Sequence, residues 1–186
     1  MIKKMFPEIG EVFQKPNQDL EKYFFPICTV DLAKINPKWE GTIPFLLFNE
    51  DPYNEKTTKY FNRYCKDNTI GFAVNNGKVA LLTNLKFMSV SKKWKEWLKK
   101  TKKGYQNSKE EFITKQARFN YQSAIEVGGK PDWMQGKATP KNKKGKKLKF
   151  IGQFDSTDFA SDFCGKEIYV FYDPKEKIIV HRYQVH

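Results

Sequence analysis

The sequence has few of the residues that metal sites and most nucleophilic active sites require. It contains two histidines, His181 and His186, and three cysteines, Cys28, Cys65 and Cys164, with no Cys-x-x-Cys pair. Zinc sites need several Cys or His ligands at short spacings, and a Ser or Cys nucleophile needs a general base beside it. Neither a GxxxxGK[ST] nor a GxGxxG motif is present. The composition therefore predicts no metal, no cofactor and no enzymatic activity.

Signals for export and for membrane insertion are also lacking. The odd number of widely spaced cysteines argues against a disulfide framework and for a reducing compartment. The first ten residues have no apolar segment typical of a secretory signal. No run approaches the 18 or so apolar residues of a transmembrane helix. We expect a cytoplasmic protein without membrane contact.

Arginine is scarce although the chain is strongly basic. The net charge is +13, but only Arg63, Arg118 and Arg182 of the 34 basic residues are arginines. A large positive charge favours an acidic partner such as nucleic acid. Lysine, however, is a solvated point charge without the planar fork of arginine, and surplus lysine also serves solubility. Binding of RNA is therefore the alternative hypothesis, with the candidate contacts Lys92, Lys93, Lys99, Lys143, Lys144 and Lys147.

The most informative positive feature is a pattern that occurs twice. In each copy a strand-like run ends in an aspartate (Asp31, Asp155), a glycine follows ten residues later (Gly41, Gly165), and a second apolar run leads to Asp-Pro. Repeated spacing of this kind indicates a duplicated supersecondary unit. We predict a single domain over residues 1–186, with repeat units at about 23–52 and 148–174 in a pseudo-two-fold arrangement and an insertion at 53–127.

Apolar periodicity predicts a β-rich α+β fold with two antiparallel repeat units and helices from the middle of the chain. Strands are expected at 23–31, 43–48, 69–74, 78–83, 149–154, 167–172 and 178–185. The Asn75-Asn76-Gly77 step predicts a hairpin, and Pro44 indicates that its strand either starts late or lies at an edge.

The middle of the chain carries the helical signals. Short helices are expected at 55–66 and 91–100. A further helix is expected to start at Ser108, which forms a capping-box pattern with Glu111, and to end before Gly128. Residues 136–149 hold seven lysines and predict a solvated loop.

The segment Gly128-Gly129-Lys130-Pro131-Asp132-Trp133-Met134-Gln135 is the most distinctive short motif. Paired glycines permit unusual backbone angles, and Pro131 restrains the residue before it. Trp133 then has two interpretations: an aromatic anchor in a binding cleft, or a structural residue that fills the seam between the two repeat units.

The repeated aspartates also have two interpretations. A pair of carboxylates can act as general acid and base, and a hydrolase built on Asp155, Asp158 and His181 is the weaker hypothesis of this class. Their position directly after a strand favours a simpler role, in which each aspartate caps the turn that follows. His181 lies in the middle of an expected strand, which favours a structural role.

The C-terminal third resembles the YwqG-like family of bacterial proteins. The resemblance depends on the Gly128–Gln135 segment, on Phe150-Ile151-Gly152-Gln153-Phe154-Asp155, and on Gly165 followed by the Tyr169–Tyr172 strand. It implies a duplicated α+β fold without established enzymatic activity. Members often have a cysteine pair between the first two motifs, and this sequence has none there, so a zinc knuckle is not implied.

The resemblance also implies a function in protein binding. The family is grouped with programmed-cell-death-like proteins that act as chaperones in ribosomal-protein assembly, and some bacterial relatives occur in toxin loci. We therefore predict a protein-binding module, chaperone-like or toxin-neutralising, that clasps one protein partner between its repeat units. The predicted partner-binding residues are Gly129, Pro131, Trp133, Gln135, Gln153 and Asp155.

Overall fold

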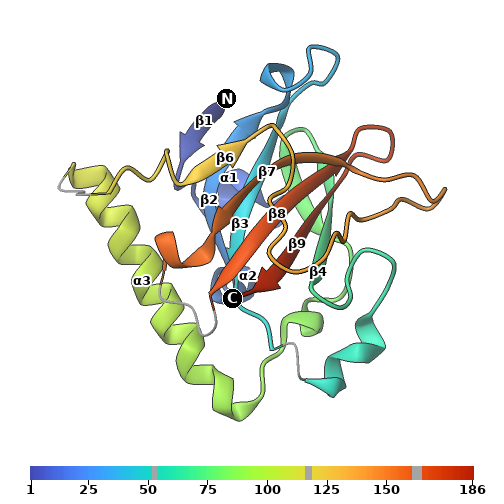
Figure 1. Ribbon diagram of the computed structural model, residues 1–186. Coiled ribbons are helices and arrows are strands. Elements are labelled where there is room, and N and C mark those ends of the chain that lie inside the picture. The colour runs from blue at the N-terminus through green and yellow to red at the C-terminus, as the bar shows by residue number, and fades with distance from the viewer. Residues whose placement is uncertain (52–53, 116–118, 161–164) are drawn as a thin grey trace.

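The computed structural model describes residues 1–51, 54–115, 119–160 and 165–186 (Figure 1). Among the positions discussed above, Pro52, Arg118 and Cys164 lie outside these ranges. The chain forms, in order, β1 (Ile2–Met5), α1 (Ile9–Val12), α2 (Gln18–Tyr23), β2 (Phe24–Asp31), the 3-10 helix η1 (Leu32–Lys34), β3 (Thr42–Phe48), η2 (Glu55–Tyr60), β4 (Thr69–Asn75), β5 (Lys78–Leu81), η3 (Leu85–Met88), η4 (Lys92–Trp94), α3 (Lys95–Thr114), β6 (Ile125–Val127), β7 (Lys149–Asp155), η5 (Ser156–Asp158), β8 (Lys166–Asp173) and β9 (Ile178–Val185).

The strands form two antiparallel sheets, which confirms the predicted β-rich α+β class. One sheet has the order β1-β2-β3, and the other has the order β5-β4-β9-β8-β7-β6. The strand that carries Pro44 begins at Thr42 and is an edge strand, so the edge position is the alternative that the structure shows. Asn76 and Gly77 both have positive φ at the tip of the β4–β5 hairpin, as its turn type requires. No helix among the described residues is both long and apolar enough to cross a bilayer.

The duplicated pattern corresponds to a repeated strand–turn–strand unit. In the first unit β2 leads through η1 to β3, and in the second β7 leads through η5 to β8. Asp31 accepts a hydrogen bond from the main-chain N–H of Ala33 (3.0 Å), and Asp155 accepts one from Thr157 (2.8 Å). The simpler interpretation of the paired aspartates, as caps of the following turn, is therefore confirmed.

The likeness of the two units extends to their irregularities. The β2–β3 ladder shifts register around Ile27, and the β7–β8 ladder shifts at the equivalent Ile151. A third strand pairs with each unit along the residues that follow the shift. The N–H of Phe6 after β1 donates to the carbonyl of Ile27, and that of Gly128 after β6 donates to the carbonyl of Ile151, both at 2.7 Å. Phe6 and Gly128 both have positive φ. The sequence pattern missed these third strands because β6 and β1 are short.

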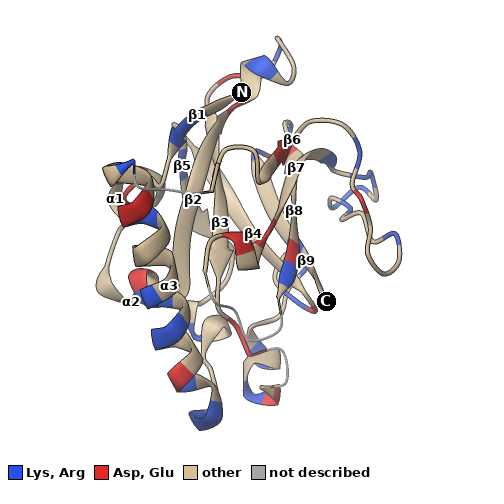
Figure 2. Ribbon diagram, turned by 60° about the vertical axis from the view of Figure 1, so that its left-hand side comes forward, with Lys and Arg blue, Asp and Glu red and all other residues tan. Residues whose placement is uncertain are grey.

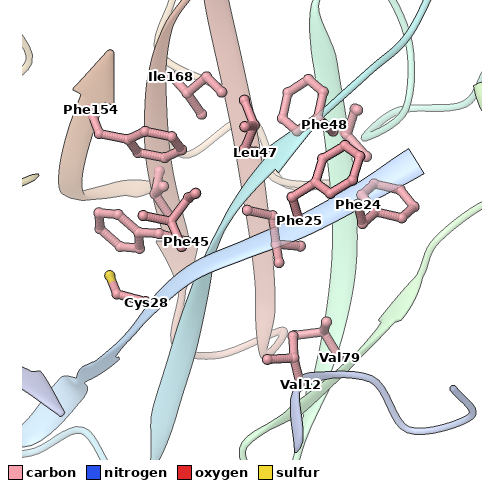
Figure 3. Close-up of a cluster of buried hydrophobic side chains, with 14 of the residues drawn as sticks. Val12, Phe24, Phe25, Cys28, Phe45, Leu47, Phe48, Val79, Phe154 and Ile168 are labelled. Atoms are coloured by element: carbon pink, nitrogen blue, oxygen red, sulfur yellow. The ribbon is translucent and has the colours of Figure 1, made fainter. Parts of the chain in front are cut away.

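The core lies where the two sheets meet. Figure 3 shows Phe45 and Leu47 of β3 among Phe154 and Ile168 of the larger sheet. The rings of Phe45 and Phe154 stack with centroids 6.1 Å apart. All four side chains are at most 1% exposed, so the space between the repeat units is filled with packed apolar side chains.

Helix α3 covers the smaller sheet, and it corrects two predictions. It runs continuously from Lys95 to Thr114, so the short helix expected at 91–100 extends well beyond residue 100, and Ser108 lies inside this helix instead of starting a second one. The helix continues because its buried side chains, Leu98, Thr101 and Tyr105, follow helical spacing onto one packed face. The hydroxyl of Tyr105 donates to the carbonyl of Pro26 in β2 (2.8 Å), which fixes the helix on the sheet.

The short helix predicted at 55–66 is only partly formed. Residues Glu55–Tyr60 adopt a 3-10 helix, after which the chain turns and Tyr64 and Cys65 become buried. Cys28 and Cys65 are buried free thiols, in line with the absence of a disulfide framework.

Candidate functional site

The Gly128–Gly136 loop lies on the outer face of the larger sheet, on the side away from the core. Alternate residues of β8 separate the two faces: Ile168 and Val170 belong to the main core, whereas Tyr169 and Phe171 belong to a smaller cluster outside it. The Trp133 ring packs on Tyr169 (4.6 Å between centroids) and stacks on Phe171 (5.9 Å, 16° between planes). Trp133 therefore does not fill the seam between the repeat units.

Tyr169 anchors the middle of the loop. Its hydroxyl donates to the carbonyl of Asp132 (2.7 Å) and accepts from the N–H of Met134 (3.2 Å). The N–H of Asp132 donates to the side-chain oxygen of Gln153 (2.9 Å). Gln153 is buried, so this predicted partner-binding residue instead braces the loop from below.

Gln184 anchors the end of the loop. Its side chain accepts from the N–H of Gln135 (3.1 Å) and donates to the carbonyl of Gly136 (2.8 Å). The Gln135 side chain donates in turn to the carbonyl of Val185 (2.8 Å). Side chains from β7, β8 and β9 thus satisfy the main-chain groups of the loop, which fixes its conformation before any partner arrives.

The loop still presents an apolar surface. Met134 is 47% exposed and Trp133 is half-buried, while Gly129 is exposed and Pro131 half-buried beside them. A rigid loop that displays a tryptophan edge and a methionine is suited to protein contact, because the ordering cost has been met during folding. Four of the six predicted residues, Gly129, Pro131, Trp133 and Gln135, belong to this one loop.

A group of carboxylates borders the loop. Glu126, Asp155 and Glu167 lie on the neighbouring strands β6, β7 and β8, with Asp155 directly opposite Glu167 in the ladder. We call the full set, Glu126, Asp132, Asp155, Asp158 and Glu167, the acidic group. Figure 2 shows acidic positions on β6 and β8 in a chain whose other charged positions are mostly basic.

The pKa of Glu167 reflects its burial and the repulsion within the acidic group. Burial, followed by the negative charges of Asp155, Glu126, Asp132 and Asp158, raises the pKa of Glu167 to about 7. Among the described residues, the one ion pair of the group joins Asp155 to His186 (3.0 Å). The group is therefore a site of uncompensated negative charge.

Two members of the acidic group and the neighbouring His186 could together offer ligand atoms to a metal ion. Oxygen atoms of Asp155 and Glu167 and a ring nitrogen of His186 lie within 4.8 Å of one another. Short-range motifs could not indicate this arrangement, because its members come from three different strand ends. Asp155 already caps a turn and pairs with His186.

The structure does not assemble the hypothetical hydrolase. His181 is fully buried on the inner face, where Nε2 accepts the N–H of Leu46 (3.1 Å) and the ring lies between Phe48 and Phe72. Desolvation lowers the pKa of His181 from 6.5 to about 3. Asp155 lies at the other face and has His186 as its imidazole partner, so His181 has a structural role.

The predicted RNA contacts lie in two separate places. Lys92, Lys93 and Lys99 belong to η4 and α3, whereas Lys143, Lys144 and Lys147 belong to the exposed loop that covers the larger sheet. Figure 2 shows these basic positions on different sides of the molecule. Lys99 lines a cavity of about 500 Å³ between α2 and α3, whose apolar lining includes Tyr23 and Leu98. The lysines do not form one continuous surface.

Sequence reasoning missed several residues of this site, namely Asp132, Glu167, Tyr169, Gln184 and His186. A signal for some of them was present, because Glu167 and Tyr169 alternate along β8 with residues of the main core, as Gln184 does with Tyr183 along β9. No protein-family model, curated protein or solved structure significantly matches the chain. Membership of the YwqG-like family therefore stays a prediction from the motifs.

Proposed function

We propose that this protein is a non-enzymatic binding module that holds a basic segment of one partner protein. The segment lies across the acidic group and against Trp133 and Met134 of the adjoining loop. The observation that carries the proposal is the concentration of four carboxylates around a fifth, Glu167, in a chain of net charge +13.

The negative charge of the acidic group requires a positively charged partner. Repulsion among the carboxylates of the acidic group destabilises the isolated protein, and a cationic partner relieves this repulsion on binding. The pKa of Glu167, raised to about 7, falls when a positive charge approaches, so binding releases bound proton near neutral pH. Lysine- and arginine-rich segments, such as those of nucleic-acid-binding proteins, have the complementary chemistry.

The loop supplies the apolar part of the interface. Its main-chain groups are already bonded to Tyr169, Gln153 and Gln184. Partner binding at Trp133 and Met134 therefore orders little of this protein, and an aromatic side chain at the centre of such a patch is typical of binding hot spots. A chaperone of basic proteins and a neutraliser of a basic toxin both have this recognition chemistry.

Two charge-matched variants test the proposal. One replaces Glu126, Asp132 and Glu167 by amides, and the control replaces three acidic residues elsewhere, Glu21, Glu40 and Glu55, by glutamine. Both remove three negative charges, so they separate local recognition from net charge.

Proteins retained from nuclease-treated native lysate are identified, and the retained protein is purified and titrated calorimetrically. We expect a basic protein that binds wild type and the control but binds the acidic-group variant and Trp133→Ala at least about tenfold more weakly. Retention of nothing, equal binding by the two charge variants, or loss of all binding on nuclease treatment overturns the proposal.

A further inference from the structure

A second polar cavity lies on the same face of the larger sheet, apart from the acidic group. Its volume is about 490 Å³, within the size range of small-molecule sites. Val180 and Arg182 of β9 and Thr69 of β4 contribute the sheet side, and residues 138–141 of the covering loop contribute another wall. Arg63 and Lys66, just before β4, complete it.

The cavity lining is predominantly cationic and includes two arginines. Arg63, Lys66, Lys141 and Arg182 face one carboxylate, Asp67. Arginine is rare in this chain, yet two of its three arginines line this one cavity. The planar guanidinium offers a fork of donors that matches the oxygens of a phosphate group, which the ammonium of lysine does not.

Neither arginine has a carboxylate in ion-pair contact among the described residues, and only the charge of Asp67 acts on Arg182 from nearby. Arg182 donates from Nη1 to the main-chain carbonyl of Asp67 (3.1 Å), and Arg63 donates to that of Asn142 (3.4 Å). The Nε of Arg182 is buried without a hydrogen-bond partner.

A buried donor without a partner is costly, and the cost is larger on a charged group. Most buried polar atoms in proteins are bonded, so the Arg182 guanidinium, which lines the cavity, is short of hydrogen-bond acceptors that an anionic ligand could supply. The ligand must be anionic, because the lining is predominantly cationic. Its remaining part meets the apolar surfaces of Val180 and Pro140.

We propose that this cavity binds the phosphate group of a small phosphorylated molecule, with Arg182 and Arg63 contacting the phosphate oxygens. A phosphate monoester carries between one and two negative charges near neutral pH, enough to offset the excess cations of the lining. The limited volume favours a single small molecule over a nucleic-acid strand. This site is independent of the acidic group.

In the experiment, each probe is added stepwise to the full chain and binding is monitored by two-dimensional NMR. The salt concentration is about 150 mM, at which non-specific contacts of exposed lysines are weak. The probes are ribose 5-phosphate, inorganic phosphate, ribose and a short single-stranded RNA. We expect ribose 5-phosphate to shift the main-chain amide signals of Thr69, Ala138 and Val180 with saturation, and ribose to leave them unchanged. Equal affinity for inorganic phosphate would identify the free ion as the ligand source.

Variants assign the effect to the arginines. Arg63 is exposed, so Arg63→Gln is expected to fold and to weaken binding about tenfold. Arg182→Lys keeps the charge but removes the fork, and is expected to weaken binding as well. The control, Lys34→Gln, removes one exposed positive charge in η1 and is expected to bind as wild type.

Three results would overturn the proposal. One is the absence of saturable shifts with either phosphate probe. Another is an equal loss of affinity in Arg63→Gln and Lys34→Gln, which would show a general effect of net charge. The third is binding of the RNA alone, with shifts spread over the lysine-rich surfaces.

Discussion

The burial of His181 makes a quantitative prediction about acid stability. The imidazole is 0% exposed, accepts the N–H of Leu46 from the edge strand β3, and has aromatic neighbours in Phe48 and Phe72. Protonation would place a charge in the apolar core and would convert the accepting nitrogen into a donor that faces another donor. Burial accordingly lowers the pKa of His181 to about 3 in the folded protein, from 6.5 when the chain is unfolded.

The sign of the effect follows from linkage. Between pH 6.5 and pH 3 the unfolded chain binds a proton at this position and the folded chain does not, so unfolding is favoured as pH falls. The contribution of His181 to stability is fully present above about pH 6.5. At about 1.4 kcal/mol per pH unit, the free energy of unfolding falls by about 2 kcal/mol between pH 7 and pH 5 from this residue alone.

The assay is urea unfolding at pH 7 and pH 5 for wild type, His181→Gln and His186→Gln. Glutamine retains an acceptor for the Leu46 N–H but does not titrate, so the loss between the two pH values should be about 2 kcal/mol smaller in His181→Gln than in wild type. His186→Gln retains His181, so it should keep the loss of stability that His181 causes. Wild type and His181→Gln share every other titrating group, and these groups cancel in the comparison of the two.

A second measurement covers the case in which His181→Gln does not fold. The His186→Gln variant contains a single imidazole, whose NMR signals should show no protonation between pH 8 and pH 5. Titration of His181 near pH 6.5 in the folded protein, or identical pH dependence in wild type and His181→Gln, would refute the reasoning.

Three further changes have expected outcomes. Gly152→Ala should destabilise the protein by about 2–3 kcal/mol in urea unfolding, because its Cβ would collide with a main-chain oxygen of β6 and lie 2.9 Å from an aromatic carbon of the core. The control is Gly136→Ala, where nothing lies within 4 Å of the added Cβ, and its stability should stay within about 0.5 kcal/mol of wild type. Equal effects of the two substitutions would contradict the packing argument. Tyr169→Phe removes the hydroxyl that anchors the Gly128–Gly136 loop, so it should cost about 1–3 kcal/mol and speed hydrogen exchange of the loop amides; unchanged exchange would show that the loop is held by other contacts. The folded protein binds the Glu167 proton more tightly than the unfolded chain does, so this residue opposes folding increasingly as pH rises from 4.5 through about 7. Glu167→Gln should therefore be more stable than wild type at pH 8, and the difference in the free energy of unfolding should narrow towards pH 5. A difference that widens towards pH 5 would refute the assignment.

The amino-acid sequence by itself determined the strands other than β1 and β6, the duplication and the turns. These features depend on interactions between residues close together in the chain: alternation along β9, the Asn75–Gly77 hairpin, and the caps formed by Asp31 and Asp155, each of which bonds an N–H two residues later. Such short-range geometry is specified locally, so periodicity and spacing were sufficient to predict it.

The tertiary structure alone decided where the functional surfaces lie. It joined the expected helices into α3 through contacts with the smaller sheet, and it placed Trp133 on the outer face of the larger sheet instead of in the seam between units. It also brought the acidic group together and set Arg63 beside Arg182. These groupings join residues separated by tens of positions, and strand order and register set them, whereas periodicity in the chain specifies only which face of a strand a residue occupies.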